Sequence, residues 1–378
     1  TILSHWFRGK GLAFSIALHI AVSKLFGWLA SATVVEVAER TNFYGNAFWV
    51  GEGISLFSLL MVAIYALMMW MLNRRKQREE QLTNEDDNES TVTSTKLAKE
   101  SIFASRDPEK AKKKKVTWRQ LYYMVYFPDI YWVLPLNEFI LGAAWTAILN
   151  IAAEYVEKRW NENRVMAAWK SSVSMAVPIV VSPVAGLYID RFGQRGHMVM
   201  ISAVLMVISI GLLGWTMVSP MASLTLYSVS LTLGPVALTS AVALYLPMNM
   251  VGTGIGLIKC GLNFGVVIVD VLIGRLQDGD NDSYDRVMVM IMVLSCISLV
   301  TAAMFVVGDY RLEKGIQSAN FYRRKELMEA RKPREEAIQA NAAENATFPK
   351  YRYLYGIIVV SLFIISWIIY GTYLLVPK

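Results

Sequence analysis

Long apolar runs, interrupted by only a few isolated charges, are the feature that most limits how this chain of 378 residues can fold. Hydrophobic residues make up 55% of the chain and charged residues 18%. A soluble domain carries about a quarter charged residues, and a single soluble core cannot bury so many apolar runs. A lipid bilayer instead accommodates each run of about 20 apolar residues as a helix. The sequence therefore predicts an all-α membrane protein.

Nine apolar runs are long enough to be predicted as membrane-spanning helices. Between Gly196 and Ile258 the chain carries no charged residue other than His197, so this stretch must fold back on itself. Breaks near Ser219–Pro220 and Pro247–Asn249 divide it. The predicted spans are Gly11–Val37, Gly53–Asn73, Ile130–Ala153, Ser171–Ile189, a fifth and a sixth within the uncharged stretch, a seventh at about 250–274, Val287–Gly308 and Leu354–Pro377.

Lys and Arg residues collect in certain segments between the spans. Residues 74–127 contain an acidic block and a basic block, a composition typical of a disordered linker, and residues 309–353 form a second charged segment. If the spans alternate in direction, both segments and the 190–195 loop face one side, which the excess of Lys and Arg identifies as cytosolic. The net charge of +7 then reflects loops beside a lipid bilayer, so we do not expect binding to nucleic acid.

Catalytic and metal-binding patterns are lacking in the sequence. It contains no nucleophile elbow, no paired metal-ligand spacing and no P-loop, so we expect no enzyme, no cofactor and no metal site. Both cysteines, Cys260 and Cys296, fall in predicted spans and do not indicate a disulfide framework.

A short turn between the fourth and fifth predicted spans combines glycines, an aspartate and basic residues. Glycines permit the bend, and Asp190 can accept hydrogen bonds from a helix N-terminus or an arginine. The turn resembles the G-x-L-x-D-R-x-G-R-R loop of the major facilitator superfamily, with Tyr188 and Gln194 as departures. The alternative is an ordinary basic turn. The residues of this motif are Gly186, Asp190, Arg191, Gly193 and Arg195.

The resemblance implies the major facilitator superfamily fold, in which six helices, a central cytosolic loop and six more helices follow one another. Only two spans precede the long linker here, so we expect helices five to twelve, with the first four missing and an extra C-terminal transmembrane helix. The predicted domains are 1–73 for the end of the N-terminal bundle, 74–127 for the cytosolic linker, 128–308 for the C-terminal bundle, 309–353 for a cytosolic charged segment and 354–378 for the extra helix.

Two short stretches narrow the resemblance within the superfamily. Trp6–Lys10 is followed by a basic residue, Lys24, deep in the next span, and the glycine-rich stretch Gly254–Gly265 lies in the seventh span. Both are similar to stretches of lysosomal dipeptide carriers. The resemblance implies secondary active or facilitative transport of a small-molecule substrate by alternating access, with dipeptides or amino acids first. It also implies a lysosomal or vacuolar membrane and an accessory membrane glycoprotein as a partner.

Four charged residues lie well inside predicted spans, away from the span ends, and a charge inside the bilayer is costly enough that it usually marks a binding or permeation path. The resemblance maps them onto helices that face the central cavity of the superfamily. The spans assigned to the outer helices six, nine and twelve have no charge in their middles, which supports a polar central cavity. The four residues are Lys24 in helix five, Glu138 in helix seven, and Lys259 and Asp270 in helix eleven.

The resemblance assigns to Lys24 the binding of a substrate carboxylate, which a compact ammonium group can hold. The alternative is a structural salt bridge to a missing helix. Glu138 lies about 12 Å into its span and could bind a substrate amino group or carry a proton. Trp145, seven residues further on, is expected on the same helix face and could contact a ligand. The alternative for Glu138 is a buried carboxylate paired with Lys259 or another cation.

Lys259, Asn263 and Asp270 follow one another at intervals of four and seven residues, which places them on one face of a helix. A polar stripe of this kind fits a cavity wall, so all three are predicted to bind substrate. The alternative for Asp270, which lies nearer the far end of its span, is pairing with Arg275 or another neighbour.

Three other functions stay open on the sequence alone. The first is a proton-coupled carrier of another organic ion. The second is a non-transporting membrane receptor or scaffold, in which residues 74–127 and 309–353 would bind cytosolic proteins or anionic lipid. The third is a product without transport activity, because eight helices do not complete a pathway between two bundles.

Overall fold

The computed structural model of this chain describes residues 12–40, 45–89, 127–246, 250–279, 284–320, 322–324, 326, 327, 329 and 351–375. All regular structure within these residues is helical, and no strand occurs among them. The chain forms two units, one made of Thr1–Glu36 with Tyr123–Lys378 and the other of Val37–Tyr122. The predicted all-α class is confirmed.

The first long helices are α2 (Leu12–Arg40) and α3 (Gly45–Glu89). The apolar part of α3, Gly51–Leu72, matches the second predicted span. The helix then continues through residues 74–89, for which the prediction of a disordered linker is wrong. That stretch begins with Arg, Lys, Gln and Glu, which have high helix propensity, so the helix extends beyond its apolar part. Residues 90–126 of the predicted linker lie outside the described residues.

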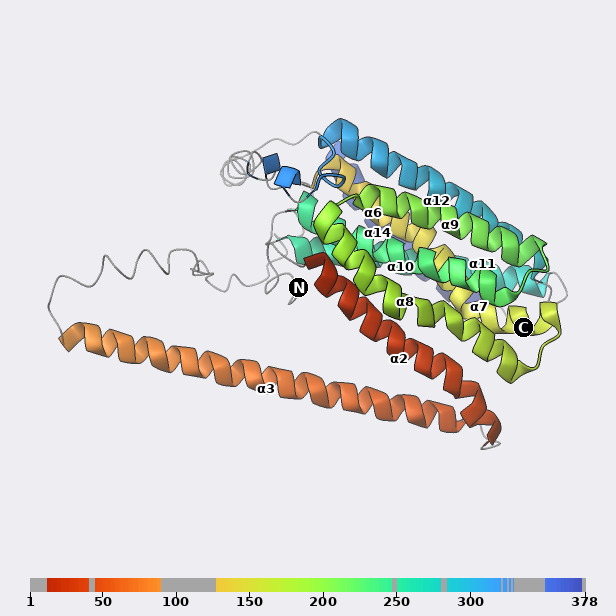
Figure 1. Cartoon of the computed structure of the whole chain (residues 1–378), viewed down its shortest axis with the longest axis horizontal. Coiled ribbons are helices and arrows are strands. Elements are labelled where there is room, and N and C mark those ends of the chain that lie inside the picture. Colours follow the sequence, from red (N-terminus) through yellow and green to blue (C-terminus); the bar gives the residue numbers. More distant parts are fainter. Residues whose placement is uncertain are drawn as a thin grey trace. The chain divides into compact units, whose positions relative to one another are not determined.

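The remaining long helices of the larger unit form a bundle (Figure 1). Helix α10 packs against α8 and α9, α12 packs against α9, and α11 packs against the segment from α6 to α7. The elements of the bundle are η2 (Asp129–Trp132), α6 (Val133–Asn137), η3 (Glu138–Gly142), α7 (Ala143–Trp160), α8 (Arg164–Phe192), α9 (Arg195–Trp215), α10 (Pro220–Tyr245), α11 (Val251–Asp278) and α12 (Asp285–Leu312).

Eight segments in the described part of the chain are long and apolar enough to cross a membrane, and they match the first eight predicted spans. The ninth predicted span corresponds to α14 (Tyr351–Leu375), whose apolar stretch Val360–Thr372 is shorter. Helix α14 packs against α11, where the rings of Phe264 and Phe363 lie 6.0 Å apart.

Helix α11 approaches the segment from α6 to α7 so closely that two of its glycines leave no room for a side chain. A Cβ atom on Gly261 would lie 2.6 Å from the carbonyl oxygen of Pro135, and one on Gly265 would lie 2.1 Å from that of Phe139. Small residues at such crossings let membrane helices bring their backbones together. This crossing places α11 directly beside η3, where the candidate site lies.

We expect Gly265→Ala to lower the free energy of unfolding by about 1–3 kcal/mol, because the new methyl group must push a backbone carbonyl away. Denaturant unfolding of the purified protein in detergent micelles measures this change. Gly256→Ala on the same helix is the matched control, since no atom lies within 4 Å of a Cβ placed there. Equal stability of the two variants would contradict the tight crossing.

Candidate functional site

A single π-helical turn, η3, interrupts the helix that runs from Val133 to Trp160. A π turn contains one more residue than an α-helical turn, so the side chains that follow it are rotated by about 100° relative to an uninterrupted α-helix. The turn begins at Glu138 and ends at Gly142. Such turns are frequent at functional sites, and this one directs Glu138 toward α11.

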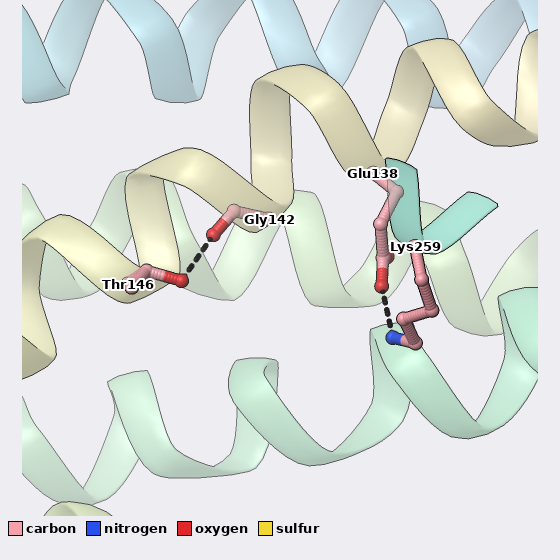
Figure 2. A network of polar contacts seen from close by, with 4 residues as sticks. All are labelled: Glu138, Gly142, Thr146 and Lys259. Carbon is pink, nitrogen blue, oxygen red and sulfur yellow. Dashed lines mark hydrogen bonds and ion pairs between the residues drawn. The ribbon is translucent and has the colours of Figure 1, made fainter. Parts of the chain in front are cut away.

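Glu138 and Lys259 form an ion pair between η3 and α11, with Lys259 Nζ 2.7 Å from Glu138 Oε1 (Figure 2). The side chain of Glu138 is 2% exposed and that of Lys259 is 45% exposed. Glu138 Oε2 is buried and has no hydrogen-bond partner among the described residues. The pairing named as the alternative interpretation of Glu138 is therefore confirmed, and it leaves the second carboxylate oxygen buried without a partner among the described residues.

Gly142 and Thr146 shape the end of the π turn. The Thr146 hydroxyl donates to the carbonyl oxygen of Gly142 over 3.0 Å (Figure 2). A Cβ atom on Gly142 would lie 2.6 Å from Leu262 Cδ1 of α11 and 3.4 Å from Glu138 Cγ. The absence of a side chain at Gly142 thus gives space both to the carboxylate and to α11.

Lys24 of α2 provides a second cation close to this pair. Its Nζ lies 3.5 Å from Met175 Sδ of α8, and its positive charge and that of Lys259 disfavour each other. Glu138 balances only one of the two positive charges. An anionic group bound near Lys24 and Lys259 would therefore be stabilised electrostatically.

Asn263 and Asp270 lie on the exposed side of α11, as expected for a polar stripe with Lys259. Asp270 accepts hydrogen bonds from Asn150 Nδ2 of α7 over 3.3 and 3.4 Å, and this is the neighbour that the structure shows for it. Eleven residues separate Asp270 from Lys259, which is about 16 Å along a helix. An extended dipeptide covers about 7 Å of backbone, so its backbone alone is shorter than the distance between the two residues along the helix.

Trp145 does not share the face of Glu138, and that expectation is wrong. Its indole N–H donates to Ser230 Oγ of α10 over 3.0 Å, and its buried ring lies against Gly234. The additional residue in the π turn rotates Trp145 away from α11 and toward α10. The structure therefore does not support the predicted contact of Trp145 with a ligand.

Buried serines join α9, α10 and α8, and sequence reasoning missed them. The hydroxyl groups of Ser202 and Ser230 bond to each other's carbonyl oxygens over 2.8 and 2.7 Å. Ser228 Oγ donates to the carbonyl oxygen of Ser174 over 2.8 Å. The regular recurrence of serine in otherwise apolar α9 and α10 was the available signal. These contacts fix the position of α10, the helix whose Ser230 accepts the hydrogen bond from the Trp145 indole.

The turn motif of Gly186, Asp190, Arg191, Gly193 and Arg195, which we call the Asp190 motif, caps the N-terminus of α2. The carboxylate of Asp190 accepts hydrogen bonds from the backbone N–H groups of Ala13 over 3.2 Å and Phe14 over 2.9 Å. This confirms that Asp190 binds a helix N-terminus, where a carboxylate satisfies free N–H groups. A Cβ atom on Gly186 would lie 2.8 Å from Phe14 Cα and 2.6 Å from Ala17 Cβ. Helices α2 and α8 are therefore in direct contact at this end.

The other motif residues shape the turn between α8 and α9. Gly193 has a φ of +77°, and Arg195 is buried with its Nε donating to Ser240 Oγ over 3.1 Å. Arg191 is exposed and lies over the ring of Phe192. The two departures from the superfamily pattern contact each other, since the Tyr188 hydroxyl donates to Gln194 Oε1 over 2.9 Å.

Comparison with known proteins adds an independent finding. The family model of the Major Facilitator Superfamily matches residues 134–378. The lysosomal dipeptide transporter MFSD1 of Homo sapiens is 22% identical over 304 residues, which are 78% of this chain and 57% of that protein. The proteins of the same name from Pongo abelii and Bos taurus are 22% and 20% identical, with the same shares covered. The chain thus spans little more than half the length of these relatives.

Proposed function

Because this chain belongs to the Major Facilitator Superfamily, we propose that the protein is a carrier that moves small organic solutes across a membrane by alternating access. It is a multi-pass membrane protein. In this proposal residues 1–73 contribute to the N-terminal bundle and residues 128–308 form the C-terminal bundle. The observation that supports it most is the ion pair between the buried Glu138 and the partly exposed Lys259, since charges inside membrane spans mark substrate paths.

The proposed substrates are dipeptides or amino acids. A zwitterion carries a carboxylate, which suits Lys24 and Lys259, and an ammonium group, which suits the negative charge of Glu138. The name of the MFSD1 relatives supports the same class and a lysosomal or vacuolar membrane. The accessory membrane glycoprotein stays a prediction from the sequence. A proton-coupled carrier of another organic ion is the second candidate, favoured by the buried carboxylate of Glu138.

Loss of the Lys24 charge tests the assignment. We expect Lys24→Met to lower uptake of a labelled dipeptide at least about tenfold, because the substrate carboxylate loses an ammonium partner that would contribute about 1.5–3 kcal/mol. Uptake is measured in proteoliposomes containing the protein expressed from its full coding sequence. Lys170→Gln is the control, since Lys170 pairs with Glu162, at the opposite end of α8 from the Asp190 motif.

Two results would contradict this proposal at different levels. Wild-type uptake by Lys24→Met would show that Lys24 does not bind the substrate. No uptake of any dipeptide or amino acid by the unmodified protein would overturn the substrate class, and uptake of other organic ions with a proton gradient would then favour the second candidate.

A further inference from the structure

After α12 the chain reverses direction and folds back onto the bundle. The reversal passes through Lys314 and Gly315, which have φ values of 56° and +73°. Ile316 and Gln317 are fully buried directly after it. We call residues 313–320 and 322–324 the tail segment. It belongs to the region that the sequence indicated only as a charged segment, yet its first part is built into the bundle.

Gln317 holds the tail segment on three helices. Its backbone N–H donates to Asp309 Oδ2 of α12 over 3.1 Å, and its side-chain amide donates to the carbonyl oxygen of Ala241 of α10 over 3.1 Å. Its own carbonyl oxygen accepts from the backbone N–H of Arg195 at the start of α9 over 3.0 Å. The tail segment is therefore fixed beside the α8–α9 turn.

The tail segment also contacts the Asp190 motif directly. A Cβ atom on Gly193 would lie only 2.2 Å from the carbonyl oxygen of Ala319, so the two backbones touch. Arg324 is 9% exposed, and its Nη2 donates to the backbone carbonyl oxygen of Asp190 over 3.3 Å. Burial lowers the pKa of Arg324, and the negative charge of Asp190 opposes that change, so the two residues interact electrostatically as well.

Asp190 thus lies between two partners at the end of α8. Its carboxylate faces the N-terminus of α2, and its carbonyl oxygen, in the last turn of α8, faces the guanidinium group of Arg324. Cations near a helix C-terminus and carboxylates near an N-terminus are both stabilising. Arg324 therefore contacts the backbone of the same residue, Asp190, whose carboxylate caps α2.

We propose that Arg324 is a positioning residue of the carrier, which holds the backbone of Asp190 so that its carboxylate caps α2 and keeps this end of the pathway closed. The inference rests on the proposed function, because closure has a meaning only for a protein that works by alternating access. It adds a role for the segment after α12, which the likeness to the superfamily left without one. Removal of the guanidinium group frees the last turn of α8 and weakens the cap.

Thiol labelling tests the proposal without a transport assay. Ala13→Cys on α2 serves as the reporter, because Ala13 is 1% exposed beside the Asp190 cap and becomes accessible only when α2 and α8 separate. It is introduced with Cys260→Ala and Cys296→Ala into the protein expressed from its full coding sequence. A membrane-impermeant maleimide is added from the side of the α8–α9 turn. We expect Arg324→Ala to raise the labelling rate about tenfold, as loss of a charge-assisted hydrogen bond allows.

Two further variants separate a positioning role from a general effect of charge or folding. Arg323→Ala removes the same charge from an exposed neighbouring residue and is expected to change the rate less than about twofold. Arg324→Lys retains a donor and is expected to restore slow labelling in part. If Arg324→Ala does not elute as folded protein, Arg324→Gln replaces it, and it must label faster than Arg324→Lys for the proposal to hold.

Asp190→Asn distinguishes failure of this proposal from failure of the proposed function. Faster labelling in Asp190→Asn together with an unchanged rate in Arg324→Ala would overturn the role of Arg324 and leave the cap in place. An unchanged rate in both variants would show that the cap does not close the pathway, which would also count against alternating access at this contact. Equal acceleration in Arg324→Ala and Arg323→Ala would overturn the proposal in favour of a surface-charge effect.

Discussion

Lys259→Met is expected to lower the free energy of unfolding by about 3–5 kcal/mol, because it leaves the carboxylate of Glu138 buried without its cation. The side chain of Glu138 is 2% exposed, so water cannot replace the lost partner. Denaturant unfolding in detergent micelles measures the loss. Lys158→Met is the matched control, because the Lys158–Glu154 pair has side chains that are 42% and 53% exposed. An exposed pair contributes less than about 1 kcal/mol.

A double variant separates stability from transport at the same pair. Glu138→Gln combined with Lys259→Met removes both charges, so it is expected to recover most of the lost stability. Dipeptide uptake by this variant is nevertheless expected to fall at least about tenfold, because the site has lost both charges that would bind a zwitterion. If Lys259→Met unfolds like the unmodified protein, the ion pair does not stabilise the fold. If the double variant transports at the normal rate, the pair has no part in substrate binding.

The spans were predictable from a local requirement, and for Asp190 the kind of contact was predictable although its partner was not. A bilayer demands long apolar helices, and these leave a strong signal in any sequence. The first N–H groups of α2 need acceptors, and an aspartate in a turn beside a helix N-terminus supplies them. Which helix Asp190 caps was not predictable, because Ala13 and Phe14 lie 177 and 176 residues away from it.

The pairing of Glu138 depends on contacts between distant segments, so the sequence left two interpretations open. Glu138 and Lys259 are 121 residues apart, and only the crossing of α11 over η3 brings them together. The π turn could not be predicted from the sequence either, because the composition of residues 138–142 does not differ from that of an ordinary α-helical segment. It was this turn that made the expected position of Trp145 wrong, since helical spacing assumes an uninterrupted α-helix.

Residues 74–89 were misjudged because composition was read without the helix that precedes them. Composition indicates whether a segment can bury apolar surface, but residues 74–89 extend a helix that has already been nucleated by an apolar span. The tail segment is fixed by a few buried contacts, above all those of Gln317 and Arg324, rather than by apolar content. Such polar contacts to helix ends leave little trace in composition, so the composition of a charged segment does not reveal whether part of it belongs to the bundle.

The contact between the Asp190 motif and the tail segment predicts a second large effect. Gly193→Ala is expected to lower the free energy of unfolding by at least about 3 kcal/mol. Alanine at a φ of +77° costs about 1–2 kcal/mol by itself, and the new Cβ atom would lie 2.2 Å from the carbonyl oxygen of Ala319. A backbone carbonyl cannot rotate away as a flexible side chain can, so either the turn or the tail segment must move.

Gly315→Ala isolates the clash from the backbone strain. Gly315 has a φ of +73°, and a Cβ atom there would meet only the ring of Tyr310 at 3.1 Å, so this variant is expected to lose about 1–2 kcal/mol. The difference between the two variants in denaturant unfolding then measures the contact between Gly193 and Ala319. Gly193→Ala should also label faster at Ala13→Cys, because displacing the tail segment moves Arg324 away from Asp190. Equal stability of the two variants would show that strain alone governs this turn and that the tail segment does not press against it.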